Sequence, residues 1–562
     1  MSRTVGIGLQ SFEFIRENDC FYVDKTKFIR EWWESKDSVT MITRPRRFGK
    51  TLTLSMAEQF FSVKYNGRGE LFQGLSIWQD EKYRKLQGTY PVISLSFANV
   101  KEKDYESTVR RINQILSDLY YDYSFLTKSE CLLPEEKEYF RSVSEDMLET
   151  TASIALHRLS KYLYKYCNKK VIILLDEYDT PMQEAYVNGY WNEVVSFTRS
   201  LFNSAFKTNP YLERAIMTGI TRVSRESIFS DLNNLEVVTT TSEKYADSFG
   251  FTEEEVFAAL DEFGMSDKRQ EVKSWYDGFT FGSHTDIYNP WSVLNYLDKR
   301  KVGAYWANSS SNSLVGKLIR EGSKEIKQSL ECLMGDGTLR VEIDEQIVYG
   351  ELYTKRNSVW SLLLASGYLK VLQMEFIEKT GHWYHTLALT NKEVEMMFEK
   401  MIRSWFSDQD ENYNDFITAL LSDDLKAMNY YMNKVALATF STFDTGKKPS
   451  EDAEPERFYH GFVLGLLVDL ADRYTVTSNR ESGFGRYDVM LEPKQDDDGI
   501  ILEFKVQDME DEKELSDTVK SALRQIEAKK YETMLVSKGI PEGKIRKYGF
   551  AFCGKKVLIG KE

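Results

Sequence analysis

The chain has 562 residues, of which 42% are hydrophobic and 28% charged, and its formal net charge at pH 7 is −14. At roughly 150 residues per domain this length suggests about three domains, and the apolar content excludes a largely disordered chain. A protein this acidic does not coat nucleic acid indiscriminately, so any nucleic-acid site must be a local basic surface.

The sequence lacks the features of a secreted or membrane-spanning protein. No stretch approaches the ~20 uninterrupted apolar residues of a membrane helix, and the first residues have no apolar run before their first acidic side chains. The five cysteines are scattered without a CxxC pair, which fits neither a disulfide framework nor a zinc site. We therefore expect a reduced, cytoplasmic protein that does not associate with membranes.

The first 240 residues alternate apolar strands with helical stretches. Strands are predicted at Val39–Thr43, Pro91–Phe97, Val171–Leu175 and Arg214–Gly219, and helices at Leu52–Phe61, Lys101–Tyr121, Ser144–Cys167 and Trp191–Phe206. This alternation predicts an α/β fold, a parallel sheet covered by helices on both faces. From Phe249 to about Phe443 the pattern is mostly helical.

A polar stretch, Thr445–Pro455, is predicted to be a linker before a last domain. The elements expected after it are a helix at Arg457–Ala471, strands at Tyr474–Ser478, Arg486–Leu491 and Gly499–Val506, a helix at Leu515–Tyr531 and a strand at Thr533–Ser537. This is an αβββαβ order. We therefore predict three domains, over 1–247, 248–443 and 444–562, of which the middle one is a mostly helical connector.

The segment RPRRFGKT, residues 44–51, matches the P-loop pattern G-x-x-x-x-G-K-[ST] except that Arg44 replaces the first glycine. A strand leads into a tight turn and then into a helix whose free N–H groups face an anion. Lys50 is expected to reach the β- and γ-phosphates of ATP, and Thr51 to ligate Mg²⁺. The predicted nucleotide-binding residues of this loop are Arg46, Arg47, Phe48, Gly49, Lys50 and Thr51.

Two later strands end in polar residues where ligands of parallel sheets bind. VIILLDEYD places Asp176 to hold Mg²⁺ and Glu177 to orient or deprotonate a water, although acids that merely cap a strand are the alternative. RAIMTGITRVSR places Thr218 to sense the γ-phosphate and Arg222 to stabilise charge in phosphoryl transfer, although an ordinary surface loop is the alternative.

Several motifs recur in a defined order: FYVDKT (21–26), RPRRFGKT (44–51), LLDEYD (174–179), TGITRVS (218–224), IFSDLNNL (228–235), WYDGF (275–279) and YNPWS (288–292). With these motifs the sequence resembles AAA-ATPase-like proteins that carry a C-terminal PD-(D/E)XK nuclease-like domain. An arginine-rich P-loop without its first glycine is usual in that family, so the resemblance implies ATP binding despite Arg44. The resemblance covers roughly residues 1–300 and 455–540. It implies an AAA-like ATPase domain with the parallel sheet of P-loop NTPases over 1–247, and a restriction-endonuclease-like PD-(D/E)XK nuclease-like domain over 444–562.

The last domain offers the carboxylates of a metal-dependent nuclease. Asp488 lies in the predicted strand RYDVML, and Glu503 and Lys505 lie in the next strand, IILEFKV. Residues i and i+2 of a strand share a face, so Glu503 and Lys505 can serve one site with Mg²⁺, or Mn²⁺ in its place. A solvated salt-bridge face is the alternative, but the apolar flanks favour the nuclease site.

The resemblance implies further members of this site. A glutamate in the helix before the first strand corresponds to Glu456, and polar residues of the helix after E-x-K correspond to Gln525, Lys529 and Tyr531. Residues 519–562 carry eleven Lys and Arg against four Asp and Glu, a basic surface that could follow a phosphate backbone or simply keep the tail soluble.

The leading hypothesis is an ATP-binding and ATP-hydrolysing protein coupled to a metal-dependent nuclease, with DNA favoured over RNA as the partner. The predicted catalytic residues are Glu177, Asp488, Glu503 and Lys505. The predicted metal ligands are Thr51, Asp176, Glu456, Asp488 and Glu503. The alternatives are a nucleotide-dependent switch whose C-terminal domain binds nucleic acid or protein without cleavage, and an ATPase that binds only proteins; formation of a homo-oligomer is left open.

Overall fold

The structure, a computed structural model, forms two compact units. The first comprises Met1–Leu318 and Asp336–Glu395, and the second Ile319–Gly335 and Met396–Glu562. The described residues are 3–222, 229, 232–309, 313–320, 324–335, 337–344, 357–379, 381–407, 410–439, 463, 467, 470, 473–478, 481–482, 485–486, 488–508, 512–553 and 556–561. The domain limits at 247/248 and 443/444 remain predictions.

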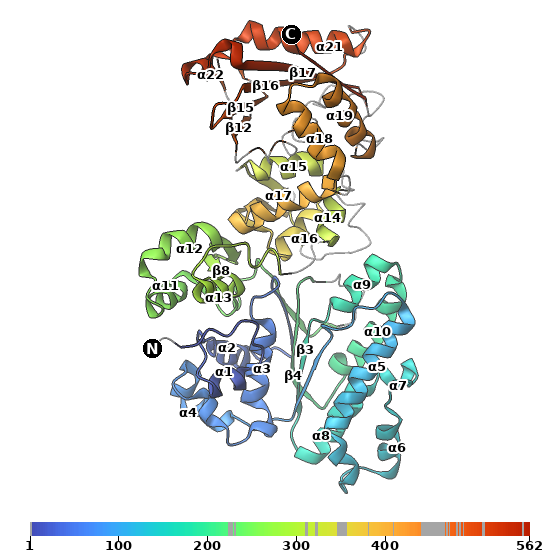
Figure 1. Cartoon of the computed structure of the whole chain (residues 1–562). Coiled ribbons are helices and arrows are strands. Elements are labelled where there is room, and N and C mark those ends of the chain that lie inside the picture. The colour runs from blue at the N-terminus through green and yellow to red at the C-terminus, as the bar shows by residue number, and fades with distance from the viewer. Residues whose placement is uncertain are drawn as a thin grey trace. The chain divides into compact units, whose positions relative to one another are not determined.

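A five-stranded parallel sheet organises the first unit (Figure 1), in the order β2-β3-β4-β1-β5. The sheet comprises β1 (Val39–Thr43), β2 (Val92–Ser96), β3 (Val171–Asp176), β4 (Leu212–Gly219) and β5 (Leu235–Val238). Every residue of β1 and β3 is buried, because helices cover both faces, as the continuous apolar runs predict. The predicted parallel sheet is confirmed.

Alternate residues of each strand face two separate cores. One core joins the sheet to α5 (Tyr105–Asp122), α8 (Ala155–Cys167) and α10 (Trp191–Phe202). The other joins it to α2 (Lys27–Ser35) and α3 (Lys50–Phe61). The shorter helices of this region are α1 (Phe12–Glu17), α4 (Glu81–Leu86), α6 (Pro134–Ser142), α7 (Glu149–Ala152) and α9 (Thr180–Asn188).

The helix predicted at Ser144–Cys167 is instead two helices, α7 and α8. The chain leaves helical geometry at Ile154, whose φ and ψ are −108° and 2°. The Ser204 hydroxyl donates to the carbonyl of Ser153, so this carbonyl is bonded from outside the helix. The break could not be predicted, because hydrophobic periodicity reflects only neighbouring residues and carries no sign of this contact with Ser204.

The region 249–443 is mostly helical in its described residues, as predicted, but it also contains two small antiparallel sheets that the sequence pattern did not indicate. One has the order β6-β8-β7 and the other β10-β11-β9. Their strands are β6 (Phe251–Thr252), β7 (Phe279–Phe281), β8 (His284–Tyr288), β9 (Leu339–Glu342), β10 (Leu369–Ile377) and β11 (His382–Leu389). β6, β7, β8 and β9 have two to five residues, which is too few for a period-two pattern to be recognised. β10 and β11, of nine and eight residues, are long enough, but a bulge between Val371 and Gln373 interrupts the alternation of β10.

Helices complete the middle region and lead into the second unit. Those of the middle region are α11 (Glu253–Glu262), α12 (Arg269–Tyr276), α13 (Pro290–Lys299), α14 (Ser313–Arg320) and α16 (Ser358–Ala365). The helices that lie wholly or mostly in the second unit are α15 (Lys324–Met334), α17 (Lys392–Ser407), α18 (Asp410–Leu421) and α19 (Leu425–Thr439).

The second unit is built on a mixed sheet in the order β12-β15-β16-β17-β18, in which only β16 and β17 pair in parallel. Its strands are β12 (Tyr474–Ser478), β15 (Val489–Pro493), β16 (Gly499–Val506), β17 (Ile545–Cys553) and β18 (Lys556–Lys561). A short hairpin pairs β13 (Glu481–Ser482) with β14 (Gly485–Arg486). The predicted Arg457–Ala471 helix and Thr445–Pro455 linker fall outside the described residues, apart from single buried positions.

The strand predicted at Thr533–Ser537 is wrong. This segment is a short helix, α22 (Thr533–Ser537), and the strand parallel to β16 is β17. The segment buries only Leu535, whereas β17 buries five consecutive residues from Tyr548 to Phe552. The crossover from β16 therefore passes through α21 (Leu515–Lys529) and α22 before the chain re-enters the sheet.

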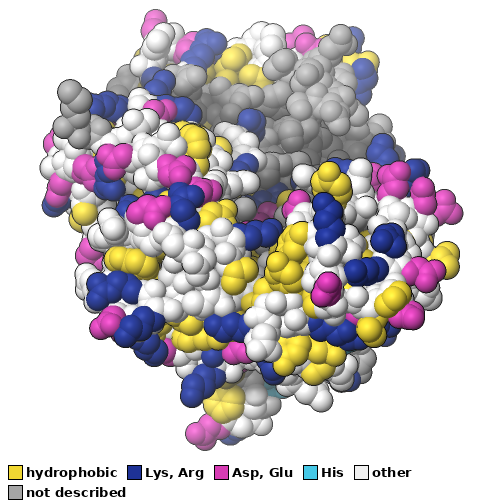
Figure 2. Space-filling model, turned by 90° about the horizontal axis from the view of Figure 1, so that it is seen from below, with side chains coloured by type: hydrophobic (Ala, Val, Ile, Leu, Met, Phe, Trp, Pro, Cys, Tyr) yellow, Lys and Arg dark blue, Asp and Glu magenta, His cyan; other side chains and the backbone are white. Residues whose placement is uncertain are grey.

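The surface mixes both signs of charge. Figure 2 shows lysine and arginine side chains interspersed with acidic and hydrophobic ones on one face of the molecule. Among the helices that the structure describes, none has the length and apolar content to cross a bilayer.

Candidate functional site

The P-loop segment connects β1 to α3 at the carboxyl edge of the parallel sheet. Gly49 precedes the helix with a φ of 82°, a left-handed conformation that glycine adopts without steric cost. Lys50 is 5% exposed, and its ammonium donates to the carbonyls of Arg44 and Pro45, each at 2.9 Å. Burial lowers the pKa of Lys50, while the nearby Glu177 and Asp176 carboxylates oppose this effect. The loop therefore curls around one buried cation.

Asp176 joins the ends of three elements. Its Oδ2 accepts a hydrogen bond from the Thr51 hydroxyl at 2.6 Å, and its Oδ1 accepts one from the Thr218 hydroxyl. Burial raises the pKa of Asp176, whereas the two hydroxyls lower it. The predicted residues Lys50, Thr51, Asp176 and Thr218 thus gather at one place, with the hydroxyl and carboxylate oxygens that hard cations prefer.

The two acids after Asp176 differ in their surroundings. Glu177 has a φ of 48° and accepts a hydrogen bond from the Thr180 hydroxyl at 3.3 Å. Asp179 is 1% exposed and accepts hydrogen bonds from the backbone N–H groups of Ile220 and Thr221 at 3.0 and 2.9 Å. Asp179, which the sequence did not single out, therefore holds the loop after β4.

Arg44, which stands where the P-loop pattern has glycine, is a fully buried side chain. Its guanidinium donates to the carbonyls of Thr43, Thr239 and Tyr245 at 2.9, 2.6 and 3.4 Å, and it lies 4.5 Å from the ring centroid of Phe281. Burial lowers the pKa of Arg44 to about 9. This arginine fixes the start of the loop to the chain after β5.

The next loop residues contact a part of the chain more than 200 residues away. The Phe48 side chain is 1% exposed and packs on Phe279 and Phe281, so only its backbone can face a nucleotide. The Arg47 guanidinium lies 4.3 Å from the ring centroid of Trp291. The predicted nucleotide-binding role of the Arg46 and Arg47 side chains remains a prediction.

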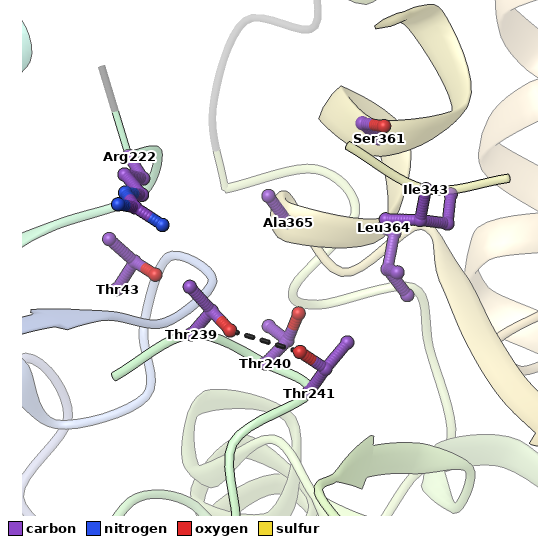
Figure 3. A pocket seen from close by; sticks show the side chains of 9 residues that line it. All are labelled: Thr43, Arg222, Thr239, Thr240, Thr241, Ile343, Ser361, Leu364 and Ala365. Atoms are coloured by element: carbon purple, nitrogen blue, oxygen red, sulfur yellow. Dashed lines mark hydrogen bonds between the residues drawn. The ribbon is translucent and has the colours of Figure 1, made fainter. Parts of the chain in front are cut away.

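Arg222 lines a separate pocket (Figure 3). The lining residues are Thr43, Arg222, Thr239, Thr240, Thr241, Ile343, Ser361, Leu364 and Ala365. Hydroxyls in this pocket bond within the protein, since Thr239 pairs with Thr241 at 3.1 Å and Ser361 accepts from the Asp344 N–H at 3.1 Å. The lining does not include Lys50, Thr51 or Asp176.

The C-terminal carboxylates meet at the β15–β16 pair. The sequence predicted that Asp488 lies within a strand, but in the structure this residue directly precedes β15. Val489 pairs with Leu502 in the antiparallel register. Asp488, one residue before Val489, therefore lies beside Glu503, one residue after Leu502. The Asp488 Oδ2 accepts a hydrogen bond from the Phe504 N–H at 2.8 Å. The structure therefore brings the two predicted acids together.

Helix α21 covers the face of the sheet that carries Glu503. The Gln525 amide donates to the Glu503 Oε1 and, at 3.2 Å, to the Tyr531 hydroxyl. Burial raises the pKa of Tyr531, and the charges of Glu503 and Asp488 add to this effect. Gln525 and Tyr531 thus join the site, as the resemblance implied. Glu503 itself is 2% exposed.

A close approach of α21 to β17 fixes this arrangement. Gly549 pairs with Glu503 in the sheet register, and a Cβ added there would lie 2.9 Å from the Val519 carbonyl. Phe504 points to the opposite face and packs against Phe550, so the alternation places Lys505 on the Glu503 face. The predicted ligand Glu456 lies outside the described residues.

The basic tail is partly neutralised by acids of its own unit. Ion pairs join Lys538 to Glu492, Lys544 to Asp496, Arg546 to Asp498 and Lys561 to Asp423. The net positive charge that this surface can offer to a phosphate backbone is therefore smaller than the count of basic and acidic residues in the sequence suggests.

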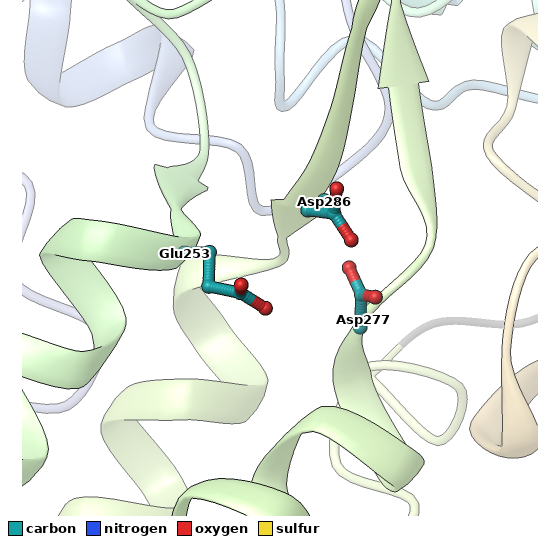
Figure 4. Close-up of side chains that lie close together, drawn as sticks. All are labelled: Glu253, Asp277 and Asp286. Atoms are coloured by element: carbon teal, nitrogen blue, oxygen red, sulfur yellow. The ribbon is translucent and has the colours of Figure 1, made fainter.

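A further acidic cluster consists of Glu253, Asp277 and Asp286, whose carboxylates converge (Figure 4). The Lys273 ammonium contacts Glu253 and lies 3.3 Å from Asp286, so an internal cation already balances part of this charge. Burial, together with the Asp286 carboxylate, raises the pKa of Asp277 to about 6. Among the described residues, this is the one group of three or more His, Cys, Asp or Glu side chains whose ligand atoms all lie within 4.8 Å of one another.

Comparison with known proteins matches two regions of the chain to family models. Residues 6–229 match the family model described as predicted AAA-ATPase, and residues 454–562 match that of the PD-(D/E)XK nuclease superfamily. The chain thus combines an N-terminal AAA-ATPase-like region with a C-terminal domain of the PD-(D/E)XK nuclease superfamily.

A curated protein of Azotobacter chroococcum mcd 1, described as an uncharacterized protein in the vnfD 5'region, is 26% identical over 373 residues. The match covers 66% of this chain and 64% of that protein, which is less than two thirds of its length.

Proposed function

We propose that this protein binds and hydrolyses ATP with Mg²⁺ at the P-loop and cleaves phosphodiester bonds of nucleic acid, DNA in preference to RNA, at its C-terminal site. The observation that carries the nuclease part is the placement of Asp488, directly before β15, beside Glu503 of β16, with the Gln525 amide on Glu503. The family matches support the same reaction classes.

The nucleotide site has the groups that this chemistry needs. Lys50 would bind the β- and γ-phosphates, and the Thr51 hydroxyl with the Asp176 carboxylate would hold the ion. Thr218 fixes the second oxygen of Asp176 and so sets the direction of the carboxylate. Glu177 would orient the attacking water. When bound, Mg²⁺ neutralises phosphate charge and so eases attack on the γ-phosphate.

At the C-terminal site Asp488 and Glu503 would hold a divalent ion, which when bound lowers the pKa of a water and polarises the phosphodiester. The oxygen-only donor set fits Mg²⁺ or Mn²⁺. Lys505, on the Glu503 face, would position that water or stabilise developing charge. Gln525 and Tyr531 would orient Glu503, since they form a hydrogen-bonded chain with it.

A specific observation favours a second candidate function, a nucleotide-dependent switch that binds nucleic acid or protein without cutting. Glu503 is 2% exposed and its carboxylate is already engaged by Gln525. A site in this arrangement must open to admit an ion and a substrate strand, and a chain that never opens it would bind without cleaving.

The test is a cleavage assay on labelled single-stranded DNA, double-stranded DNA and RNA, with Mg²⁺ or Mn²⁺ and with or without ATP. The wild type should cut at least one substrate, Glu503→Ala and Lys505→Ala should not, and Lys50→Ala should lose ATP hydrolysis. If the wild type and Lys505→Ala are equally inert on every substrate, the nuclease proposal fails and the switch remains.

A further inference from the structure

We infer that Asn289, Trp291 and Trp306 are positioning residues of the nucleotide site, which hold the glycine-poor P-loop in its phosphate-binding shape. These residues lie in and after the YNPWS motif, which the proposed reaction does not otherwise use. The inference rests on the proposed ATP binding, and it identifies the residues that keep the P-loop in the shape needed to bind ATP.

The backbone carbonyl of Arg46 is the point at which the loop is held. It accepts a hydrogen bond from the Trp306 indole N–H at 3.0 Å and another from the Asn289 amide at 3.3 Å. Both donors come from more than 240 residues further along the chain. Two bonds to one carbonyl fix the orientation of the peptide group between Arg46 and Arg47, and hence the direction of the Arg47 N–H.

Arg47 has a backbone conformation that requires such support. Its φ is 64°, in the left-handed region that non-glycine residues adopt at a cost in free energy. The guanidinium lies over the ring of Trp291, 4.3 Å from its centroid, a cation–π contact that favours this conformation. The loop therefore obtains from neighbouring side chains the shape that a second glycine would otherwise permit.

The supporting residues are themselves fixed. Asn289 caps α13, since its Oδ1 accepts the N–H groups of Trp291 and Ser292 at 2.9 and 3.3 Å. The fully buried Glu393 accepts from the Ser292 hydroxyl at 2.7 Å and from the Trp306 backbone N–H at 3.1 Å. One carboxylate thus joins the two segments that hold the loop, so they form one rigid support.

Two conservative variants isolate this role. Asn289→Asp keeps the oxygen that caps α13 but replaces the N–H donor to Arg46 with an oxygen. Trp306→Phe keeps a ring against Phe279 and Tyr368 but lacks the indole N–H. The matched controls are Asn295→Asp, whose amide donates within α13 to the Trp291 carbonyl, and Trp78→Phe, which stacks on Phe72.

The measurement is the dissociation constant of a fluorescent N-methylanthraniloyl ATP with Mg²⁺, together with the melting temperature of each nucleotide-free variant. Loss of one hydrogen bond should weaken binding by about fivefold in either test variant, and the controls should stay within about twofold of the wild type. A second readout is the change in tryptophan emission on adding unlabelled ATP, which Trp291→Phe should reduce and Trp78→Phe should not.

The results separate the two proposals. If the wild type binds the nucleotide and Lys50→Ala does not, but Asn289→Asp and Trp306→Phe bind as the wild type does, the positioning role is overturned and ATP binding stands. A purely structural role would lower the melting temperature without changing affinity, which also overturns it. If the wild type and Lys50→Ala both fail to bind, ATP binding and the positioning role fall together.

Discussion

Replacing Glu393 with glutamine should remove a pH dependence of stability from the first unit. Glu393 is fully buried, and burial raises its pKa to about 7 from an ordinary value of 4.5. Glutamine keeps both contacts, because its oxygen can accept from the Trp306 N–H and its amide can donate to the Ser292 hydroxyl. The variant therefore changes the charge and little else.

The magnitude follows from the difference between the folded and unfolded pKa. A difference of about 2.5 corresponds to about 3.4 kcal/mol. Because the pKa of Glu393 is higher in the folded chain, the folded state binds the proton more tightly. Its contribution to stability is complete below about pH 4.5 and disappears as the pH rises through about 7. Relative to Glu393→Gln, the wild type should thus lose up to about 3 kcal/mol between pH 5 and pH 8.

The assay is urea unfolding at a series of pH values, followed by tryptophan fluorescence. Nine of the ten tryptophans lie in the first unit, so the signal reports mainly on the unit that contains Glu393. Glu254→Gln, at an exposed position of α11, is the control that removes a carboxylate without changing burial. A difference between wild type and Glu393→Gln that stays constant over this pH range would refute the reasoning, since the contribution of Asp277 is common to both proteins.

Three further substitutions test the contacts around the two sites. Arg44→Met should lower the free energy of unfolding by about 2–4 kcal/mol in urea, because buried carbonyls lose their donor; an unchanged midpoint would contradict this. Asp179→Ala should cost about 2–3 kcal/mol and speed amide hydrogen exchange at Ile220, whose N–H loses its acceptor; unaltered exchange there would argue against it. Gly549→Leu should separate α21 from the sheet, destabilise the second unit by about 1–3 kcal/mol and weaken Mn²⁺ binding measured by calorimetry; full Mn²⁺ affinity would show that the close approach is unnecessary.

The parallel sheet of the first unit and the residues at its carboxyl edge could be predicted from the sequence for a physical reason. Strands β1 and β3 are buried on both faces and therefore appear as continuous apolar runs. The carboxyl ends of parallel strands share one edge of the sheet, so the sequence alone placed Lys50 close to Asp176. The pairing of Asp488 with Glu503 was predictable in the same way, from two neighbouring antiparallel strands.

Contacts that depend on the tertiary fold could not be predicted. The bonds from Asn289 and Trp306 to Arg46 link residues far apart in the chain, and no local periodicity encodes them. The aromatic motifs suggested core packing, and the structure shows that this packing reaches the P-loop. The error at Thr533–Ser537 has a different origin, because a short apolar segment is compatible with a strand or a helix until its burial is known.

These results bear on how loss of activity in a variant should be interpreted. Arg44, Asp179 and Glu393 are buried ionisable residues near the nucleotide site, yet each bonds to backbone groups that shape a loop. A ligand residue such as Lys50 would instead act on the bound state. ATP stabilises the folded chain by RT ln(1 + c/Kd), where c is the free ATP concentration. A ligand substitution that raises the Kd should therefore remove the ATP-induced rise in melting temperature and leave the nucleotide-free value almost unchanged. A loop-holding substitution should lower the nucleotide-free value itself. Comparing the two temperatures therefore assigns each charged residue near the loop to one role or the other, which a loss of hydrolysis alone cannot do.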